Sequence, residues 1–232
     1  MNYLDLEHLT AIDPVAYQTQ HPFPYVNPEG ILHPEAHLKL VENLPPIELF
    51  TKIEGKKRSY GQKPHNRYVL EYEDGLPLPA PWQEFINELR EGTYRTILCR
   101  LMGVPDLELR FHWHWATRGD SVSPHCDARR KVGSHIFYLN TADEWDSAWG
   151  GETLVLDDGG KNFSHGSAPE FEDFTSEVHA KALGNWSFIF TRRGDSWHGV
   201  KEITCPEGHF RKIFIAVFDK PGPLHRISRL FG

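Results

Sequence analysis

The sequence has few features that would stabilise it by crosslinks or attach it to a membrane. Its three cysteines, Cys99, Cys126 and Cys205, are odd in number and far apart, so we expect no disulfide framework and a reducing, cytoplasmic location. No apolar run approaches the roughly 20 residues that span a bilayer. The N-terminal MNYLDLEHLTAID is acidic and lacks the basic and apolar regions of a secretory signal. Membrane association is therefore not expected.

An excess of basic residues is also absent. Lys and Arg number 25 against 32 Asp and Glu, which gives a net charge of -7. Sequence-independent binding to nucleic acid requires a surplus of cations, so nucleic acid is not an expected partner. The 232 residues are 39% hydrophobic and 12% aromatic, enough to build a core. We expect a single domain over 1–232.

The first part of the chain, 1–105, has the pattern of helices and loops. Pro34 and Pro81 stand where a helix can start, because proline is tolerated in the first turn. Gly103 and Pro105 indicate a helix end. Two apolar stripes follow the helical spacing of i, i+3, i+4 and i+7: Trp82, Phe85, Ile86 and Leu89, then Tyr94, Ile97, Leu98 and Leu101. We expect 1–105 to support the rest of the domain.

After residue 105 the pattern changes to that of β-strands. Short alternating or apolar runs separated by turn residues lie at 107–117, 135–140, 152–156, 186–191 and 211–219. Several short strands at this spacing predict a sandwich or a barrel. The acidic, Gly- and Ser-rich stretch 157–177 is expected to be a long loop.

A candidate metal site starts from His125 and Asp127. Residues two apart in an extended chain point to the same side, so an imidazole and a carboxylate can face one ion. His198 is the best candidate for a third ligand, because it follows a predicted strand and a turn. Two histidines and one carboxylate form the facial triad of non-haem Fe(II) oxygenases. With 14 histidines in the chain, the His-x-Asp pattern alone is a weak signal.

Arg211 strengthens this interpretation. It follows His198 by 13 positions and opens the predicted strand 211–219. A guanidinium that points into a barrel needs an anionic partner, which a dicarboxylate co-substrate would supply through paired hydrogen bonds. The alternative is that Arg211 is an exposed residue at the edge of a sheet.

Four segments, in order, carry a resemblance to a known family: WATRGDSVSPHCD, HIFYLNTADEWDSAWGGETLVL, WHGV and RKIFIAVF. Together they resemble the prolyl-4-hydroxylase-like branch of the Fe(II)/2-oxoglutarate-dependent oxygenases over about 107–220. The resemblance implies an α+β, mainly β fold. Its catalytic core over 106–220 would be a double-stranded β-helix (jelly-roll or cupin-like), with N-terminal helices packed on it.

The resemblance also implies roles for single residues. His125, Asp127 and His198 match the iron ligands, and Arg211 matches the residue that binds the distal carboxylate of 2-oxoglutarate. Tyr138 matches a residue that hydrogen-bonds the same carboxylate. Trp115 falls where many members have a tyrosine lining the co-substrate pocket, although an indole cannot accept a hydrogen bond. The implied cofactors are Fe(II), 2-oxoglutarate and molecular oxygen, with ascorbate as a further candidate.

The expected reaction is hydroxylation of an unactivated C–H bond, with release of succinate and carbon dioxide. Asp127 supports this, because related halogenases replace that carboxylate with a small residue. The expected substrate is a small polar molecule, an amino acid or a peptide. The basic segment 56–67 is either a solvated loop or a flap over such a substrate. The alternative function is a non-catalytic or zinc-bound cupin-like binding module.

Further polar residues near these motifs have two interpretations each. His112 and His114 share one side of a strand and face either a cavity or solvent. Glu152 is expected to be structural rather than a metal ligand. Asp195 is either a turn residue or a partner of a ligand imidazole. Lys131 belongs to a solvated turn or contacts an anion, and Cys126 is expected to be packed and inert.

Overall fold

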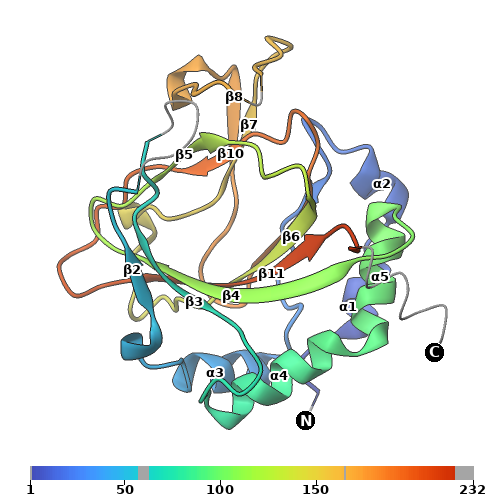
Figure 1. Ribbon diagram of the computed structural model, residues 1–232, viewed down its shortest axis with the longest axis vertical. Helices are drawn as coiled ribbons and strands as arrows, with labels where there is room; N and C mark the ends of the chain where they lie inside the picture. Colours follow the sequence, from blue (N-terminus) through green and yellow to red (C-terminus); the bar gives the residue numbers. More distant parts are fainter. Residues whose placement is uncertain (1, 57–62, 165, 223–232) are drawn as a thin grey trace.

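In the residues that the computed structural model describes, 2–56, 63–164 and 166–222, strands form two antiparallel sheets (Figure 1). The larger sheet has the order β1-β9-β6-β11-β4-β3-β2, and the smaller has the order β5-β10-β7-β8. The larger sheet contains β1 (Tyr25–Val26), β2 (Thr51–Ile53), β3 (Arg67–Glu71), β4 (Glu108–Ala116), β6 (Lys131–Tyr138), β9 (Ser187–Thr191) and β11 (Arg211–Asp219). The smaller contains β5 (Val122–His125), β7 (Leu154–Asp157), β8 (Ser176–His179) and β10 (His198–Val200). The prediction of a strand-rich, mixed fold is confirmed.

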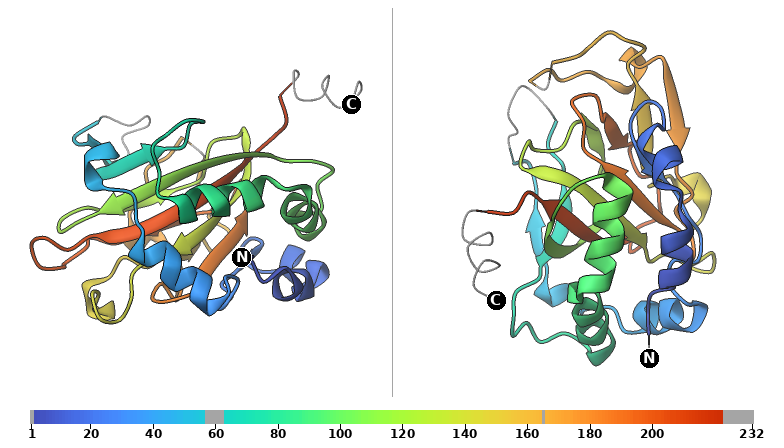
Figure 2. Two further views of the ribbon diagram at one scale, coloured as in Figure 1. Left: turned by 90° about the horizontal axis from the view of Figure 1, so that it is seen from below. Right: turned by 90° about the vertical axis from the view of Figure 1, so that its right-hand side faces the viewer.

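The helices cover the side of the larger sheet that faces away from the smaller one (Figures 1 and 2). Their bounds are α1 (Leu6–Ala11), α2 (Pro14–Gln18), α3 (Pro34–Glu42), α4 (Ala80–Arg90) and α5 (Gly92–Met102). Pro34 opens α3 and Pro81 lies in the first turn of α4, as expected. Gly103 ends α5 in the left-handed conformation, with φ 67°. None of the helices in the described ranges has the length and apolarity to span a bilayer.

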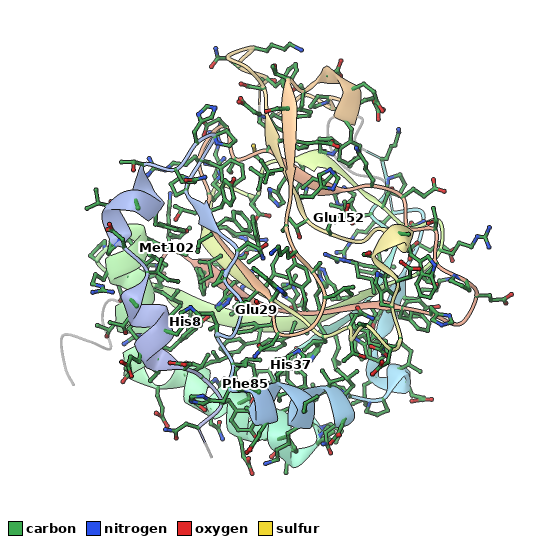
Figure 3. The ribbon with its side chains drawn as sticks, turned by 180° about the vertical axis from the view of Figure 1, so that it is seen from behind. His8, Glu29, His37, Phe85, Met102 and Glu152 are labelled. Atoms are coloured by element: carbon green, nitrogen blue, oxygen red, sulfur yellow. The ribbon has the colours of Figure 1, made fainter. Side chains whose placement is uncertain are left out.

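Aromatic side chains join the helices to the larger sheet. The ring of Phe85, on α4, lies 5.4 Å from that of Phe137 and 5.7 Å from that of Phe214 (Figure 3). Trp82 lies 5.1 Å from both Trp113 and Phe214. The two apolar stripes expected from the sequence therefore form one core with the outer side of β4, β6 and β11.

The pairing of β4 with β11 separates this core from the inside of the molecule. The two strands align in nine residue pairs, from Arg211 opposite Ala116 to Asp219 opposite Glu108. Because side chains alternate along a strand, Trp113 and Phe214 face the helices while His114 and Ile213 face the other way. The inner side of the sheet is thus left to line a cavity beneath the smaller sheet.

Several strands lie outside the predicted runs. Five short ones, β1, β2, β3, β5 and β10, have two to five residues and pair at or near a sheet edge, so partner strands rather than their own pattern define them. The predicted loop 157–177 contains a short 3-10 helix, Phe171–Asp173, and the start of β8. The middle of the predicted basic flap, 57–62, lies outside the described residues.

Candidate metal centre and its cavity

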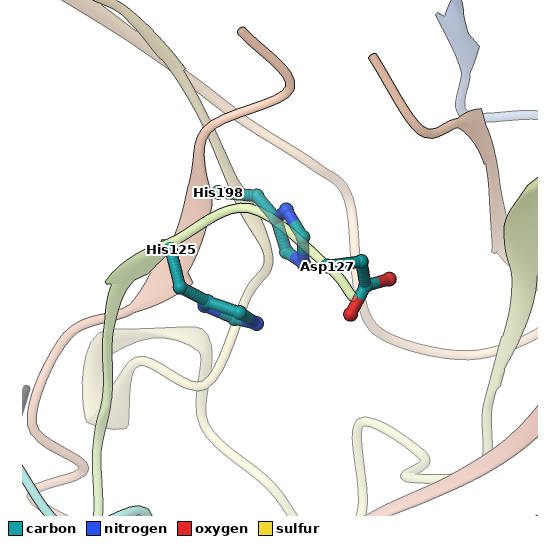
Figure 4. Close-up of side chains that lie close together, drawn as sticks. All are labelled: His125, Asp127 and His198. Carbon is teal, nitrogen blue, oxygen red and sulfur yellow. The ribbon is translucent and has the colours of Figure 1, made fainter. Parts of the chain in front are cut away.

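Three predicted side chains converge at the end of the smaller sheet. His125 is the last residue of β5, and His198, the first residue of β10, pairs directly opposite it. Asp127 follows two residues after His125 and turns back toward both rings (Figure 4). One ligand atom from each side chain lies within 4.8 Å of the other two, and the imidazole centroids are 4.3 Å apart. This spacing allows all three to coordinate one ion.

Backbone carbonyls orient the two imidazoles. Nδ1 of His125 lies 3.0 Å from the carbonyl oxygen of Ser123, and Nδ1 of His198 lies 2.9 Å from that of Ser196. An N–H at Nδ1 donates to each carbonyl, and this tautomer presents the Nε2 lone pair to a metal. In both cases the carbonyl two residues earlier in the chain orients the ring for metal binding.

The charge state of the three side chains also suits a divalent metal. Burial alone would raise the pKa of Asp127, but the nearby positive charge of Lys131 outweighs burial and holds this pKa well below its usual range. Lys131 donates a hydrogen bond of 2.9 Å from Nζ to Asp127 Oδ1. Burial lowers the pKa of His198, so its ring is neutral, the form that binds metal. An ionised carboxylate and imidazole nitrogens are donors that fit Fe(II).

The triad opens onto a cavity of about 310 Å³ between the two sheets. β5 and β10 supply its wall on the metal side, and β3, β4, β6 and β11 supply the opposite wall. Among the described residues that line it, the charged ones are Arg67, Asp127, Lys131 and Arg211. The cavity therefore carries more positive than negative charge.

Arg211 is buried at one end of this cavity, as its sequence position suggested. Its Nε donates a hydrogen bond to the carbonyl of Gly151, and its guanidinium carbon lies 6.0 Å from the centre of the Tyr138 ring. Burial lowers the pKa of Arg211, although the nearby Tyr138 and Glu152 favour the charged form. No carboxylate in the described part of the chain forms a salt bridge with Arg211. A guanidinium held in this way can bind an incoming carboxylate.

Of the other two predicted co-substrate residues, Tyr138 lies beside Arg211 and Trp115 does not. Tyr138 is buried beside Arg211, and its hydroxyl donates a 2.8 Å hydrogen bond to Thr153, which lines the cavity. Thr153 was not singled out from the sequence, although it follows Glu152 in the matched segment.

Trp115 is on the helix side of β4. Its ring packs 4.6 Å from that of Phe50 and 5.9 Å from that of Phe210, in the outer core. Strand alternation gives the cavity side to His112 and His114 instead. The position of Trp115 therefore does not support its predicted role in lining a co-substrate pocket.

The histidine pair on β4 faces the cavity rather than solvent. The rings of His112 and His114 stack with centroids 4.4 Å apart. Burial lowers the pKa of both, that of His112 to about 3, so both rings are neutral near pH 7.

The remaining candidates have structural positions. Glu152 binds His179 at 2.7 Å and lies outside the triad. The backbone carbonyl of Asp195 accepts from Trp197 in a turn, and the Asp195 side chain is exposed. Cys126 is buried, its thiol contacts the carbonyl of Gly194, and burial raises its pKa to about 12. A thiol in this state is unreactive.

Comparison with known proteins identifies the fold. No protein-family model matches the sequence, and no curated protein does. Among solved structures, a prolyl-4-hydroxylase from Pseudomonas putida matches with a TM-score of 0.62 and 15% identity, over 92% of this chain and 99% of that one. A Trichoplax adhaerens prolyl hydroxylase, solved with a hypoxia-inducible-factor peptide fragment, matches with a TM-score of 0.63 and 13% identity, over 92% and 90%.

A third match is an oxidoreductase of the 2OG-Fe(II) oxygenase family from Burkholderia pseudomallei. Its TM-score is 0.53 at 12% identity, over 94% of this chain and 91% of that one. At these identities the likeness establishes a shared fold. The likeness to prolyl-4-hydroxylases and 2OG-Fe(II) oxygenases that the sequence indicated is thus confirmed.

Proposed function

We propose that this chain, which has the fold of the 2OG-Fe(II) oxygenases, is a non-haem Fe(II)- and 2-oxoglutarate-dependent dioxygenase that hydroxylates a C–H bond. The observation that carries the proposal is that the His125, Asp127 and His198 triad and the buried guanidinium of Arg211 share one cavity. In this proposal the two sheets form a double-stranded β-helix. Residues 106–220 make the catalytic core of a single domain, and 1–105 support it.

The proposed roles follow from the chemistry of each group. His125, Asp127 and His198 would hold the iron, and Arg211 would bind the distal carboxylate of 2-oxoglutarate beside the Thr153 hydroxyl. Fe(II), 2-oxoglutarate and oxygen would supply the oxidation, in which one oxygen atom enters the substrate and the other enters succinate as carbon dioxide leaves. The chain itself needs to position these groups and exclude water. No general base is assigned.

The carboxylate of Asp127 favours hydroxylation over halogenation, because as an iron ligand it would leave no place for the chloride that related halogenases bind instead. The described cavity volume of about 310 Å³ is at the lower end of the range for ligand sites, which run from roughly 300 to 1,000 Å³. This size fits a small molecule, an amino acid or a single side chain of a peptide. The Trichoplax adhaerens protein, solved with a peptide fragment, supports keeping a peptide among the candidates.

A spectroscopic titration tests the proposed centre. Anaerobic addition of Fe(II) and 2-oxoglutarate should produce a weak visible charge-transfer band, which Asp127→Ala should abolish by removing a ligand. Arg211→Met should weaken 2-oxoglutarate binding by roughly 30-fold or more, since truncating one partner of a buried charge pair costs about 2–5 kcal/mol. Asp195→Ala and Arg118→Met, which change exposed residues, are the matched controls and should behave like the wild type.

A substrate screen tests the reaction itself. Succinate release in the presence of Fe(II), 2-oxoglutarate and ascorbate should rise with the correct amino acid, peptide or metabolite, and mass spectrometry should detect a gain of one oxygen atom. Tightly held zinc, together with no oxygen uptake dependent on 2-oxoglutarate, would contradict the proposal and identify a binding module instead.

A further inference from the structure

We propose that Arg67, Lys131 and the imidazoles of His112 and His114, which line the cavity apart from Arg211, form a carboxylate-binding subsite for the substrate. The substrate would then be a small molecule with a carboxylate head and an apolar body. This inference rests on the proposed function, because that function assigns the Arg211 end to 2-oxoglutarate.

The register of β4 and β11 separates the two ends. Arg211 pairs with Ala116, Ile213 with His114, and Ile215 with His112. A strand rises about 3.3 Å per residue, so the row that contains His112 lies roughly 13 Å along the sheet from the row of Arg211. A 2-oxoglutarate held between Arg211 and the triad therefore leaves the His112 end for a second molecule.

Two cations flank the histidine pair. Arg67 opens β3 and lies on the same side of that strand as Val69, which pairs with His114. By this register Arg67 is level with Arg211 along the sheet, but β3 is two strands from β11, roughly 10 Å across it. Lys131 opens β6 and reaches Asp127. The positive charges of both contribute to lowering the pKa of both histidines, which agrees with their position on either side of the pair.

Part of this polar wall is buried without a hydrogen-bond partner in the described structure. The Nε of Arg67 and the Nδ1 of His112 have none, although Arg67 Nη1 donates to the carbonyl of His65 at 2.8 Å. The nearest carboxylate, that of Glu71, is 3.7 Å from His112 Nδ1, and its side chain is 58% exposed at the rim. Buried polar atoms without partners cost free energy, and a bound carboxylate would accept from Arg67 Nε and from His112 Nδ1 in the tautomer that carries its proton there.

The balance of charge in the cavity also favours the binding of another anion. In the proposed enzyme, a divalent metal and the dicarboxylate 2-oxoglutarate compensate each other, and Asp127 compensates one of the three lining cations. Two cations remain inside a cavity where uncompensated charge is costly. An anionic substrate would reduce this cost, whereas a neutral one would leave it.

Apolar side chains line much of the rest of the cavity and indicate the character of the rest of the substrate. Val122 and Val200 contribute from the smaller sheet, and Ile136, Phe190 and Ile215 from the larger sheet. These residues have no hydrogen-bonding side chains, so they would contact a hydrocarbon portion and place a C–H bond near the triad.

Paired probes test the subsite by binding rather than turnover. The protein is loaded with zinc and N-oxalylglycine, an unreactive dicarboxylate analogue of 2-oxoglutarate, and titrated with hexanoate, 3-phenylpropionate and 4-hydroxybenzoate and with their primary amides. At least one acid should bind tenfold or more tightly than its amide. Arg67→Gln should weaken the acid by at least tenfold and leave the amide unchanged, and Arg67→Lys should recover part of the loss.

Arg118→Gln, the same change at an exposed arginine outside the cavity lining, should match the wild type. Unfolding midpoints and zinc affinity, measured on every variant, separate a local effect from a folding defect. Equal binding of acid and amide, failure of all three acids to bind, or an Arg67→Gln protein that binds acids normally would overturn the subsite. Failure of zinc or N-oxalylglycine to bind the wild type contradicts the oxygenase instead, and the acid and amide comparison is then made on the metal-free protein.

Discussion

At the scale of single residues, Gly151 controls where the Arg211 side chain lies. Its φ is +94°, a conformation that other residues rarely adopt, and its carbonyl accepts the hydrogen bond from Arg211 Nε. A Cβ at this position would approach Arg211 Cδ to 3.0 Å. Two adjacent glycines before a strand are typical of a position where the backbone comes close to another group, and here that group is the Arg211 side chain.

Gly151→Ala is expected to lower 2-oxoglutarate affinity more than metal affinity, because the new methyl group displaces the guanidinium and leaves the triad in place. The left-handed backbone should also cost about 1–2 kcal/mol of stability. Calorimetric titration and urea unfolding measure the two effects. Gly75→Ala is the matched control, since φ is +88° there and an added Cβ would meet nothing within 4 Å. Equal loss of 2-oxoglutarate affinity in both variants would show that strain alone is responsible.

At the scale of elements, the central strands β4, β6 and β11 serve two environments at once. Their outer side chains pack on α4 and α5, while their inner side chains line the cavity. Phe85 is the contact that joins α4 to both β6 and β11, through Phe137 and Phe214. The helix layer therefore supports the cavity wall without contributing a side chain to it.

Phe85→Ala should reduce the free energy of unfolding by about 3–5 kcal/mol, because it removes a fully buried ring and leaves a cavity in the core. Urea unfolding followed by circular dichroism measures the change. Asn87→Ala, on the exposed face of the same helix, should stay within about 0.5 kcal/mol of the wild type. A loss below about 1 kcal/mol for Phe85→Ala would mean that the helix layer does not hold the sheet in this way.

At the scale of the whole molecule, buried neutral histidines make folding sensitive to acid. His135 is fully buried, its Nδ1 lies 2.8 Å from the Tyr94 hydroxyl, and burial lowers its pKa to about 3. His112 has a pKa lowered to about the same value by burial and by nearby cations. In the unfolded chain such groups take up a proton below about pH 6.5. Between pH 6.5 and about 3 the unfolded state therefore binds more protons than the folded state.

The free energy of unfolding of the metal-free protein should consequently fall as the pH drops from 6.5 toward 3. Each of these histidines contributes up to about 1.4 kcal/mol per pH unit to this loss. His135→Asn removes one such group and should give a shallower slope between pH 6 and 4 in urea unfolding. His8→Asn, on the exposed side of α1, is the control and should keep the wild-type slope. An unchanged slope in His135→Asn would contradict this account.

The sequence by itself determined the features that depend on local spacing. The apolar stripes of α4 and α5, the alternation in β4 and β11, and the common side of His125 and Asp127 all follow from the helical and strand periods. Arg211 was also identifiable, because an arginine at the start of an apolar strand that points into a barrel needs an anionic partner.

Only the tertiary structure decided which strands meet and which side of each strand faces the cavity. It placed His198 opposite His125, turned Trp115 to the outer core, and brought Arg67 and Thr153 to the cavity wall. The physical reason is that the alternation of side chains defines two sides of a strand but does not determine which side faces the inside of the molecule. That choice depends on burial against partners far away in the chain, and short strands such as β5 and β10 form only once those partners are in place.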